Sequence, residues 1–234
     1  MKAILGRELS SYFTSPIGFI YLGAVYFMSG LFFLNGTLAA NSADIRPVFS
    51  SLLSVIMFLT PILTMRLMAE DKRRHTDQVL LTAPVNLWEI AAGKFLAAAV
   101  VYIAGISVTL IYAVTLSFFA LINWAIIFGN YIALLLLGLA FISIGLFISS
   151  LTENQAIAAI GSFAVMLAIL FLDILPAMIP NRLLAVIITE ISFIGRFTPI
   201  TSGILSVSNL FFFISVCFIF LFLTTRVLEK RRWS

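Results

Sequence analysis

The sequence predicts an all-α membrane protein with six transmembrane helices, on three observations. Of its 234 residues, 62% are hydrophobic and 10% are charged, against about 45–50% and about 25% in an average soluble domain. The mean hydropathy is +1.15. Apolar runs close to the ~20 residues that cross a bilayer recur along the chain, and residues 95–152 contain no Asp, Glu, Lys or Arg. A soluble protein of this length could not bury so much apolar surface.

The amino end predicts an amphipathic helix over residues 2–14 (KAILGRELSSYFT) that lies in the membrane interface. At 100° per residue, Arg7 and Ser11 fall on one side of this helix and its apolar side chains on the other, namely Leu5, Leu9, Tyr12 and Phe13. Pro16 predicts a break after this segment, since the residue before a proline resists helical geometry. The alternative is that residues 2–14 simply extend the first transmembrane helix, which covers about residues 17–34.

Polar and charged residues place the other five spans. A polar outer loop follows the first span and contains Asn35, Gly36, Asn41, Asp44 and Arg46. The charge-free stretch is too long for one helix at 1.5 Å per residue, so it folds back once, near Asn123 and Trp124. The polar residues 149–155 separate the fourth and fifth spans. We therefore expect spans at about 48–65, 95–119, 126–149, 156–172 and 209–225.

Prolines and charges interrupt the segment of about residues 174–206, which favours short re-entrant or interfacial helices on the outer side. Basic residues set the orientation of the chain. The amino end, residues 66–94 and the carboxyl tail carry 11 Lys and Arg, and the remaining loops carry 3. This asymmetry places both termini in the cytoplasm. We expect a multi-pass protein of the plasma (inner) membrane. The net charge of +4 thus reports orientation and does not indicate binding to nucleic acid.

Residues 66–94, which we name the ionic segment, hold nine of the chain's 24 charged residues. A helix start is expected at about Leu87, because Asn86 can cap it, Glu89 lies three residues later as in a capping box, and Val85 with Ile90 matches a hydrophobic staple. Upstream, a short helix over about residues 76–83 ends before Pro84. Composition alone leaves two interpretations open, a mechanical contact point and an ordinary interfacial loop.

The ionic segment resembles the ABC-2 permease family, the membrane subunits of ATP-driven exporters. The family carries an acidic pair, a basic residue, a Thr, a leucine-rich stretch, a Pro and a Gly-Lys pair, which are matched here by Glu70, Asp71, Lys72, Thr76, Leu80, Leu81, Thr82, Pro84, Gly93 and Lys94. The two ends of the chain, RELSSYFTSPIGFIYLGAVYF and FLFLTTRVLEKRRW, look most like the gliding-motility-associated permease subgroup. The resemblance therefore covers essentially the whole chain. It departs from the family at His75, where Gly is usual, and at Gln78, where Glu is usual.

This resemblance implies roles for particular segments. Residues 2–14 would be a cytoplasmic connecting helix, with Arg7, Glu8 and Tyr12 as its candidate residues. Residues 76–83 would be the coupling helix, which touches the ATPase, and residues 174–206 resemble the family's outer re-entrant helices. The implied ATPase-contact residues are Glu70, Asp71, Lys72, Arg73, Arg74, His75, Thr76, Asp77, Gln78, Leu80 and Leu81. The implied partners are cytoplasmic ATP-binding cassette ATPase subunits and a second permease copy or paralogue.

The sequence shows no enzyme constellation. The one histidine, His75, lies in a predicted cytoplasmic loop, which excludes a Ser–His site or a His-ligated metal within the spans. A Walker A motif is absent, because Trp88 stands where its first glycine is required and Phe95 follows the Gly-Lys pair. We therefore expect no cofactor on this chain, and ATP and Mg used by the partner ATPase.

Two other function classes remain as alternatives. A secondary transporter or channel usually places ionisable groups at mid-bilayer depth, where only Asp173 comes near, and we interpret Asp173 as an outer helix end. The second alternative is a scaffold or anchor that carries out no transport. The Phe-rich spans suit a hydrophobic or amphipathic cargo, although Phe is also ordinary lipid-facing material. Gly138 and Gly145, with Ser143, indicate close helix packing or are neutral.

Overall fold

The computed structural model describes residues 1–234 except 41, 43, 77–85, 178–187, 204–205 and 233–234. All the regular elements in these described ranges are helical. They include α1 (Lys2–Thr14), α2 (Pro16–Phe33), a π-helical turn η1 (Leu34–Leu38), α3 (Arg46–Thr64), α4 (Arg66–Arg73), α6 (Leu87–Ile106), α7 (Val108–Ser117), α8 (Trp124–Leu151), α9 (Gln155–Ile174), a 3-10 turn η2 (Leu175–Ala177), α11 (Phe193–Thr201) and α12 (Val207–Arg232).

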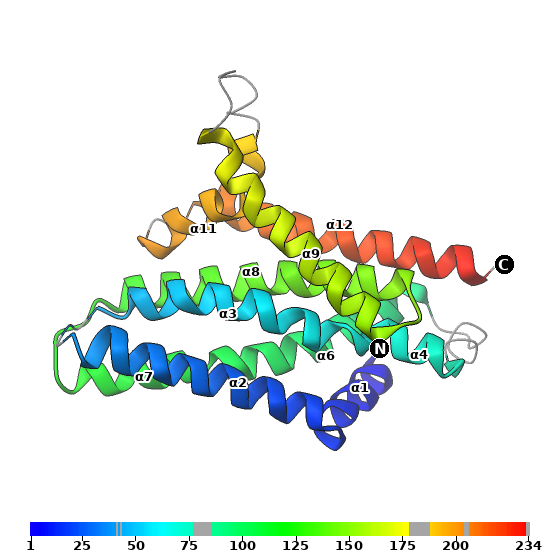
Figure 1. Ribbon diagram of the computed structural model, residues 1–234, viewed down its shortest axis with the longest axis horizontal. Coiled ribbons are helices and arrows are strands. Elements are labelled where there is room, and N and C mark those ends of the chain that lie inside the picture. Colours follow the sequence, from blue (N-terminus) through cyan, green and yellow to red (C-terminus); the bar gives the residue numbers. More distant parts are fainter. Residues whose placement is uncertain (41, 43, 77–85, 178–187, 204–205, 233–234) are drawn as a thin grey trace.

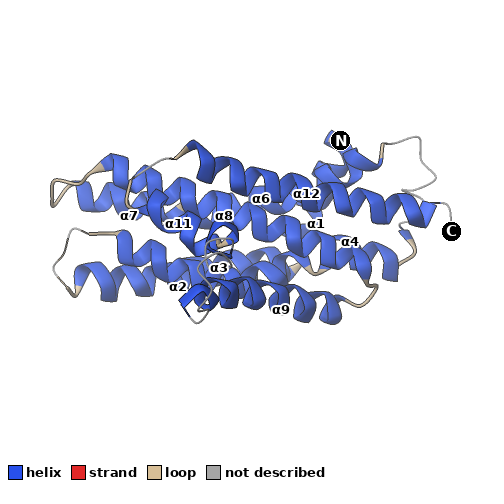
Figure 2. Ribbon diagram, turned by 90° about the horizontal axis from the view of Figure 1, so that it is seen from above, coloured by secondary structure: helices blue, strands red, loops and turns tan. Residues whose placement is uncertain are grey.

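Within the described residues, six helical stretches are long and apolar enough to cross a membrane, which agrees with the predicted number. They are Pro16–Leu38, Arg46–Arg73, Leu87–Ser117, Trp124–Leu151, Gln155–Ile174 and Val207–Arg232. The long helices α2, α3, α6–α7, α8 and α12 run side by side, and α9 crosses them obliquely (Figures 1 and 2). The two termini and α4 lie at one end of this bundle, which we name the charged end, and the turn between α7 and α8 lies at the other.

The helix boundaries follow from local chemistry that the sequence displayed. Ser15 is extended (φ −101°, ψ 155°), so that α1 and α2 are separate helices and Pro16 occupies the first turn of α2. Asn123 caps α8 by accepting a hydrogen bond from the Ala125 amide at 3.1 Å, which confirms the fold-back of the charge-free stretch. Asn86 caps α6 in the same way. Glu89, however, accepts from the amino group of Met1 at 2.7 Å.

Several helices are longer than predicted. Asn35 and Gly36 were expected in a loop, but the helix continues through them as the π-helical turn that ends at Leu38. The second span was expected to end near residue 65, whereas α4 continues it to Arg73 after a short break. The carboxyl tail also stays helical to Arg232. Basic residues in the last turns of α4 and α12 are favourable there, since they oppose the negative end of the helix dipole.

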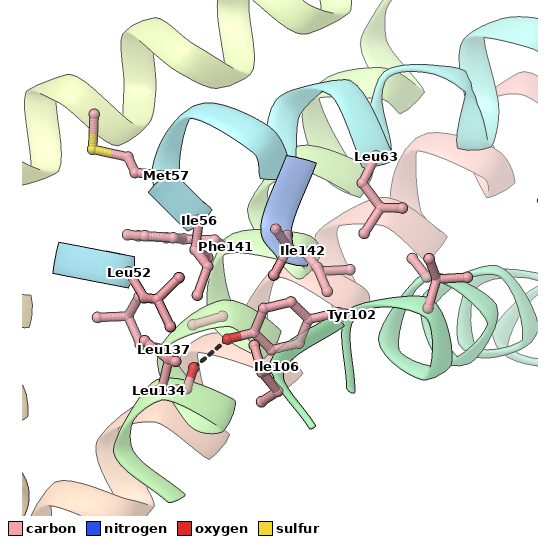
Figure 3. Packing of buried hydrophobic residues seen from close by; sticks show 14 of the residues in the cluster. Leu52, Ile56, Met57, Leu63, Tyr102, Ile106, Leu134, Leu137, Phe141 and Ile142 are labelled. Atoms are coloured by element: carbon pink, nitrogen blue, oxygen red, sulfur yellow. Dashed lines mark hydrogen bonds between the residues drawn. The ribbon is translucent and has the colours of Figure 1, made fainter. Parts of the chain in front are cut away.

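Helix α8 lies at the centre and packs against α3, α4, α6, α9, α11 and α12. Figure 3 shows Tyr102 of α6 pointing into this core, where its hydroxyl donates to the carbonyl of Leu134. Gly138 makes room for the ring, because a Cβ at this position would lie 2.1 Å from Cζ of Tyr102. At Gly145 a Cβ would lie 2.2 Å from Oγ1 of Thr64 on α3. Both glycines therefore mark close helix packing, as one of the two interpretations predicted.

Candidate functional site

A buried cluster of charges lies where α1, α4 and α6 meet. The Lys94 ammonium is 2.9 Å from Oε1 of Glu8 and 2.6 Å from Oδ2 of Asp71, and its side chain is 2% exposed. Arg7 contacts the same two carboxylates, at 2.7 Å and 3.4 Å. Thr76 donates to the other oxygen of Asp71 at 2.8 Å. These five residues, which we name the charged junction, pair two cations with two anions, as a buried charge requires.

The packing of α1 on α6 explains why Lys94 reaches these carboxylates. Ile4, Glu8 and Tyr12 recur every four residues and form the buried face of α1. Gly93 lets α1 approach α6, since a Cβ there would lie 3.0 Å from Cγ2 of Ile4. Lys94 follows directly and extends to Glu8. The Gly-Lys pair that marked the family resemblance thus provides a close approach and a buried cation.

The face of α1 that packs inside the chain differs from the apolar side predicted to lie in the membrane interface. Tyr12 and Glu8 are buried, Leu5 and Leu9 are partly exposed, and Phe13 is exposed. A charged residue on a buried face was unexpected from residue type alone. It is tolerated because Lys94 and Arg7 pair with its carboxylate. For Arg7, partial burial alone would lower the pKa, but hydrogen bonds and attraction to Glu8 and Asp71 raise the pKa above its ordinary value.

Arg66 joins α1 to the start of α4. Its guanidinium donates to the hydroxyl of Ser15 at 2.5 Å and to that of Ser11, and it lies 5.3 Å from the centre of the Tyr12 ring. Its Nε is 3.2 Å from Glu70 on the next turn of α4. The Tyr12 hydroxyl in turn donates to a backbone carbonyl at the end of α3, 2.7 Å away. The amino-terminal helix is therefore fixed to the α3–α4 break by side chains from both sides.

Ser149 of α8 fixes the other side of α4. Where the helix breaks after α3, the amides of Met68 and Ala69 both donate to the Ser149 hydroxyl at 3.1 Å. That hydroxyl donates to the carbonyl of Met65 at 3.0 Å. It thus satisfies backbone groups that a helix break would otherwise leave unpaired. One turn further along, the buried Lys72 donates to the carbonyl of Ser150.

The structure divides the predicted ATPase-contact residues into three groups. Asp77, Gln78, Leu80 and Leu81 lie outside the described residues, as does the predicted coupling helix apart from Thr76. Arg73, Arg74 and His75 are exposed at the end of α4. Of the remaining four, Asp71 and Lys72 bind to α6 and α8. Glu70 and Thr76 are partly buried and pair with residues of their own segment, namely Arg66, Arg74 and Asp71. Among the described residues of this set, only Arg73, Arg74 and His75 have fully exposed side chains.

His75 has the left-handed backbone conformation that glycine usually adopts after a helix. Its φ is +54°, and its amide donates to the Lys72 carbonyl at 3.1 Å, which closes the last turn of α4. Glycine reaches this conformation without the clash that a Cβ introduces. This geometry gives a physical reason for the Gly that the family usually has here.

A small pocket of about 170 Å³ opens beside the charged junction. Side chains of both charges line it, including Arg7, Glu8, Arg66, Asp71 and Lys94. This volume is below the ~300–1,000 Å³ of typical small-molecule sites, so the site holds helices together and is too small for a sizeable cargo. Within the part of the chain that the structure describes, no group of three His, Cys, Asp or Glu could hold a metal ion.

Asp173 lies at the end of α9, as predicted. Its carboxylate accepts from the hydroxyl of Ser192 and from the amide of Ile194, 3.3 Å away, and therefore holds the first turn of α11. This is the geometry of a carboxylate at a helix amino terminus.

A family model described as "ABC-2 family transporter protein" matches residues 11–233. No curated protein matches the chain.

Proposed function

Since the chain belongs to the ABC-2 family of transporter proteins, we propose that it is the permease subunit of an ATP-driven exporter. The match spans nearly the whole chain. Together with the six helices able to cross a membrane among the described residues, it makes this a multi-pass membrane protein. Our proposal adds that cytoplasmic ATPase subunits use ATP and Mg, and that a second permease copy or paralogue completes the transport path in the plasma membrane. The resemblance of its two ends supports placing it near the gliding-motility-associated subgroup.

The observation that carries this proposal is the attachment of α4 to three other helices. Lys94 and Asp71 join α4 to α6 and α1, and Ser149 joins it to α8. The exposed end of α4, with Arg73, Arg74 and His75, directly precedes the predicted coupling helix in the sequence. A force on that end would therefore move α1 and the helices packed on it as one unit.

In the mechanism that we propose, closure of the ATPases on ATP displaces α4 and α1. Helix α2 follows α1 in the chain, and α3 precedes α4. Both α2 and α3 then tilt against the partner permease. The charged junction keeps α1, α4 and α6 together during this movement, because separating them would leave buried charges unpaired. The termini and α4 are cytoplasmic in this proposal, as the distribution of basic residues favours.

A secondary transporter or channel has less support. Such proteins use ionisable groups that exchange ions or protons along a path through the membrane. Lys94 is the buried cation of α6, but it is paired with two carboxylates close to the charged end. The family match also favours the ATP-driven class.

The test uses Arg73, because its exposed side chain can be changed without breaking the charged junction. The full-length chain is co-expressed with its ATPase, and Arg73→Glu is compared with Arg73→Lys, which keeps the charge. We expect Arg73→Glu to lower both ATPase recovery in a pull-down and transport-coupled ATP turnover, with Arg73→Lys close to the wild type. Intact assembly and unaltered turnover in the Arg73→Glu variant would refute the proposed contact between α4 and the ATPase. Substituting Glu70 and Asp71 is less informative, since both also hold the fold.

A further inference from the structure

A second and larger groove lies at the charged end, between the amino end of α6 and the carboxyl end of α12. Its volume is about 390 Å³, and its lining includes the capping residue Asn86 and Trp88 at the start of α6, and Phe222, Arg226, Glu229 and Arg232 of α12. Figures 1 and 2 show α12 ending beside the region where α6 begins. None of these residues belongs to the charged junction.

The groove has an apolar part and a charged part along one face of α12. The apolar part of the lining is formed by Trp88 and Phe222, whose ring centres are 6.2 Å apart. Phe218 lies outside the lining, one turn before Phe222, and extends this row of rings because its centre is 5.6 Å from that of Trp88. Arg226 and Arg232 form the charged part, one to three turns further along the helix. The spacings of three and four residues place these side chains on the same side of α12. The apolar part therefore continues from the charged part towards the middle of the bundle.

The charged part carries an excess of one positive charge. Arg226 is 2.6 Å from the carboxylate of Glu229 and 4.8 Å from the centre of the Phe222 ring. Among the residues that the structure describes, Arg232 pairs with no carboxylate. Arginine presents several planar N–H donors that suit phosphate oxygens. Basic pockets between transmembrane helices, with tryptophan at the level of the head groups, match the chemistry of anionic lipids.

We propose that this groove binds one anionic phospholipid, with its phosphate between Arg226 and Arg232 and its acyl chains along Trp88, Phe218 and Phe222. The continuous apolar part favours a lipid over a soluble phosphate, which would leave the exposed rings uncovered. This site does not depend on an ATPase partner or on the direction of transport.

The experiment uses Trp88 as the reporter. A full-length chain with Trp124→Phe and Trp233→Phe is reconstituted in phosphatidylcholine vesicles. Dibrominated phosphatidylglycerol or dibrominated phosphatidylcholine is then titrated in, since bromine quenches tryptophan on contact. One net positive charge predicts a preference of about fivefold for phosphatidylglycerol. Glu229→Gln should raise that preference further, because it removes the competing carboxylate.

Two double variants with equal charge loss separate the groove from general surface attraction. Arg226→Gln with Arg232→Gln should abolish the preference. Lys230→Gln with Arg231→Gln should leave it nearly unchanged, because Arg231 lies on the other side of α12, where it pairs with Glu153 at 2.6 Å. Equal quenching by the two lipids, or equal loss in both double variants, would overturn the proposal.

Two further outcomes would also overturn the lipid assignment. If millimolar inorganic phosphate or glycerol phosphate displaces dibrominated phosphatidylglycerol, the groove is a site for soluble phosphate. If the Arg226→Gln and Arg232→Gln pair releases the ATPase while the lipid preference persists, the groove is a protein contact. A retained preference that soluble phosphates do not compete with is the result that we expect.

Discussion

Lys94→Met tests whether the charged junction holds α1, α4 and α6 together. The ammonium makes two close contacts, at 2.9 Å to Glu8 and 2.6 Å to Asp71, with 2% of its side chain exposed. Removing it leaves two carboxylates near Arg7, whose side chain is 47% exposed and hence a weaker partner. Breaking a buried pair costs about 3–5 kcal/mol. Because Arg7 remains, we expect Lys94→Met to lower the free energy of unfolding by about 3 kcal/mol. This loss corresponds to a decrease in Tm of roughly 6–12 °C at this chain length.

The assay is thermal unfolding of the full-length chain in detergent, followed by size-exclusion chromatography with fluorescence detection. Two comparisons make the result specific. The triple variant Glu8→Gln, Asp71→Asn and Lys94→Met removes all three charges and should recover most of the loss, since neutral replacement of a buried ion pair is often tolerated. Arg74→Met breaks an exposed pair with Glu70 and should cost at most about 1 kcal/mol. A Lys94→Met protein within 1 kcal/mol of the wild type would refute the reasoning, as would a triple variant no more stable than Lys94→Met.

Three other predictions concern helix packing and turns, each measured by the same thermal assay. Ser149→Ala should destabilise the protein by about 1–3 kcal/mol and speed amide hydrogen exchange at the start of α4. Ser150→Ala should change little, because the Ser150 hydroxyl bonds within its own helix. Equal effects of the two substitutions would argue against the attachment of α4 by Ser149. His75→Gly should stabilise by about 0.5–1 kcal/mol, because relief of the left-handed clash exceeds the entropy cost of glycine; a loss of stability would contradict this. Gly138→Ala should destabilise the protein by about 1–3 kcal/mol through overpacking. Gly23→Ala should not, because a Cβ at Gly23 meets nothing within 4 Å. A tolerated Gly138→Ala would disprove the close approach of Gly138 to Tyr102.

Helix number and several boundaries were predictable because they depend on local chemistry. Apolar length and charge place a span without any knowledge of its neighbours. Pro16 and the capping residues Asn86 and Asn123 act on their own backbone within two or three residues. These are the features that the structure confirmed. The expected loop at Asn35 and Gly36 was wrong, because polar residues near a helix end do not by themselves stop it.

The charged junction was not predictable as a set of contacts, because it joins residues far apart in the chain. Glu8 and Lys94 are 86 positions apart, and they meet only because Gly93 lets α1 lie against α6. One signal was present in the sequence, since Lys94 lies in an apolar helix where an unpaired cation would be costly. Its presence there indicates a carboxylate partner, but not which one. The same limit applies to Lys72, which was expected at a partner surface and is buried against α8.

The most direct test of the central claim is photo-crosslinking from the two ends of the bundle. A benzophenone amino acid is placed at Arg73, exposed at the end of α4, or at Phe119, which is 88% exposed at the opposite end. Each full-length variant is expressed with its ATPase and irradiated in membranes. Our account predicts a covalent adduct with the ATP-binding subunit from position 73 and none from position 119. An intact complex with no adduct from position 73, or an adduct from position 119, would contradict it.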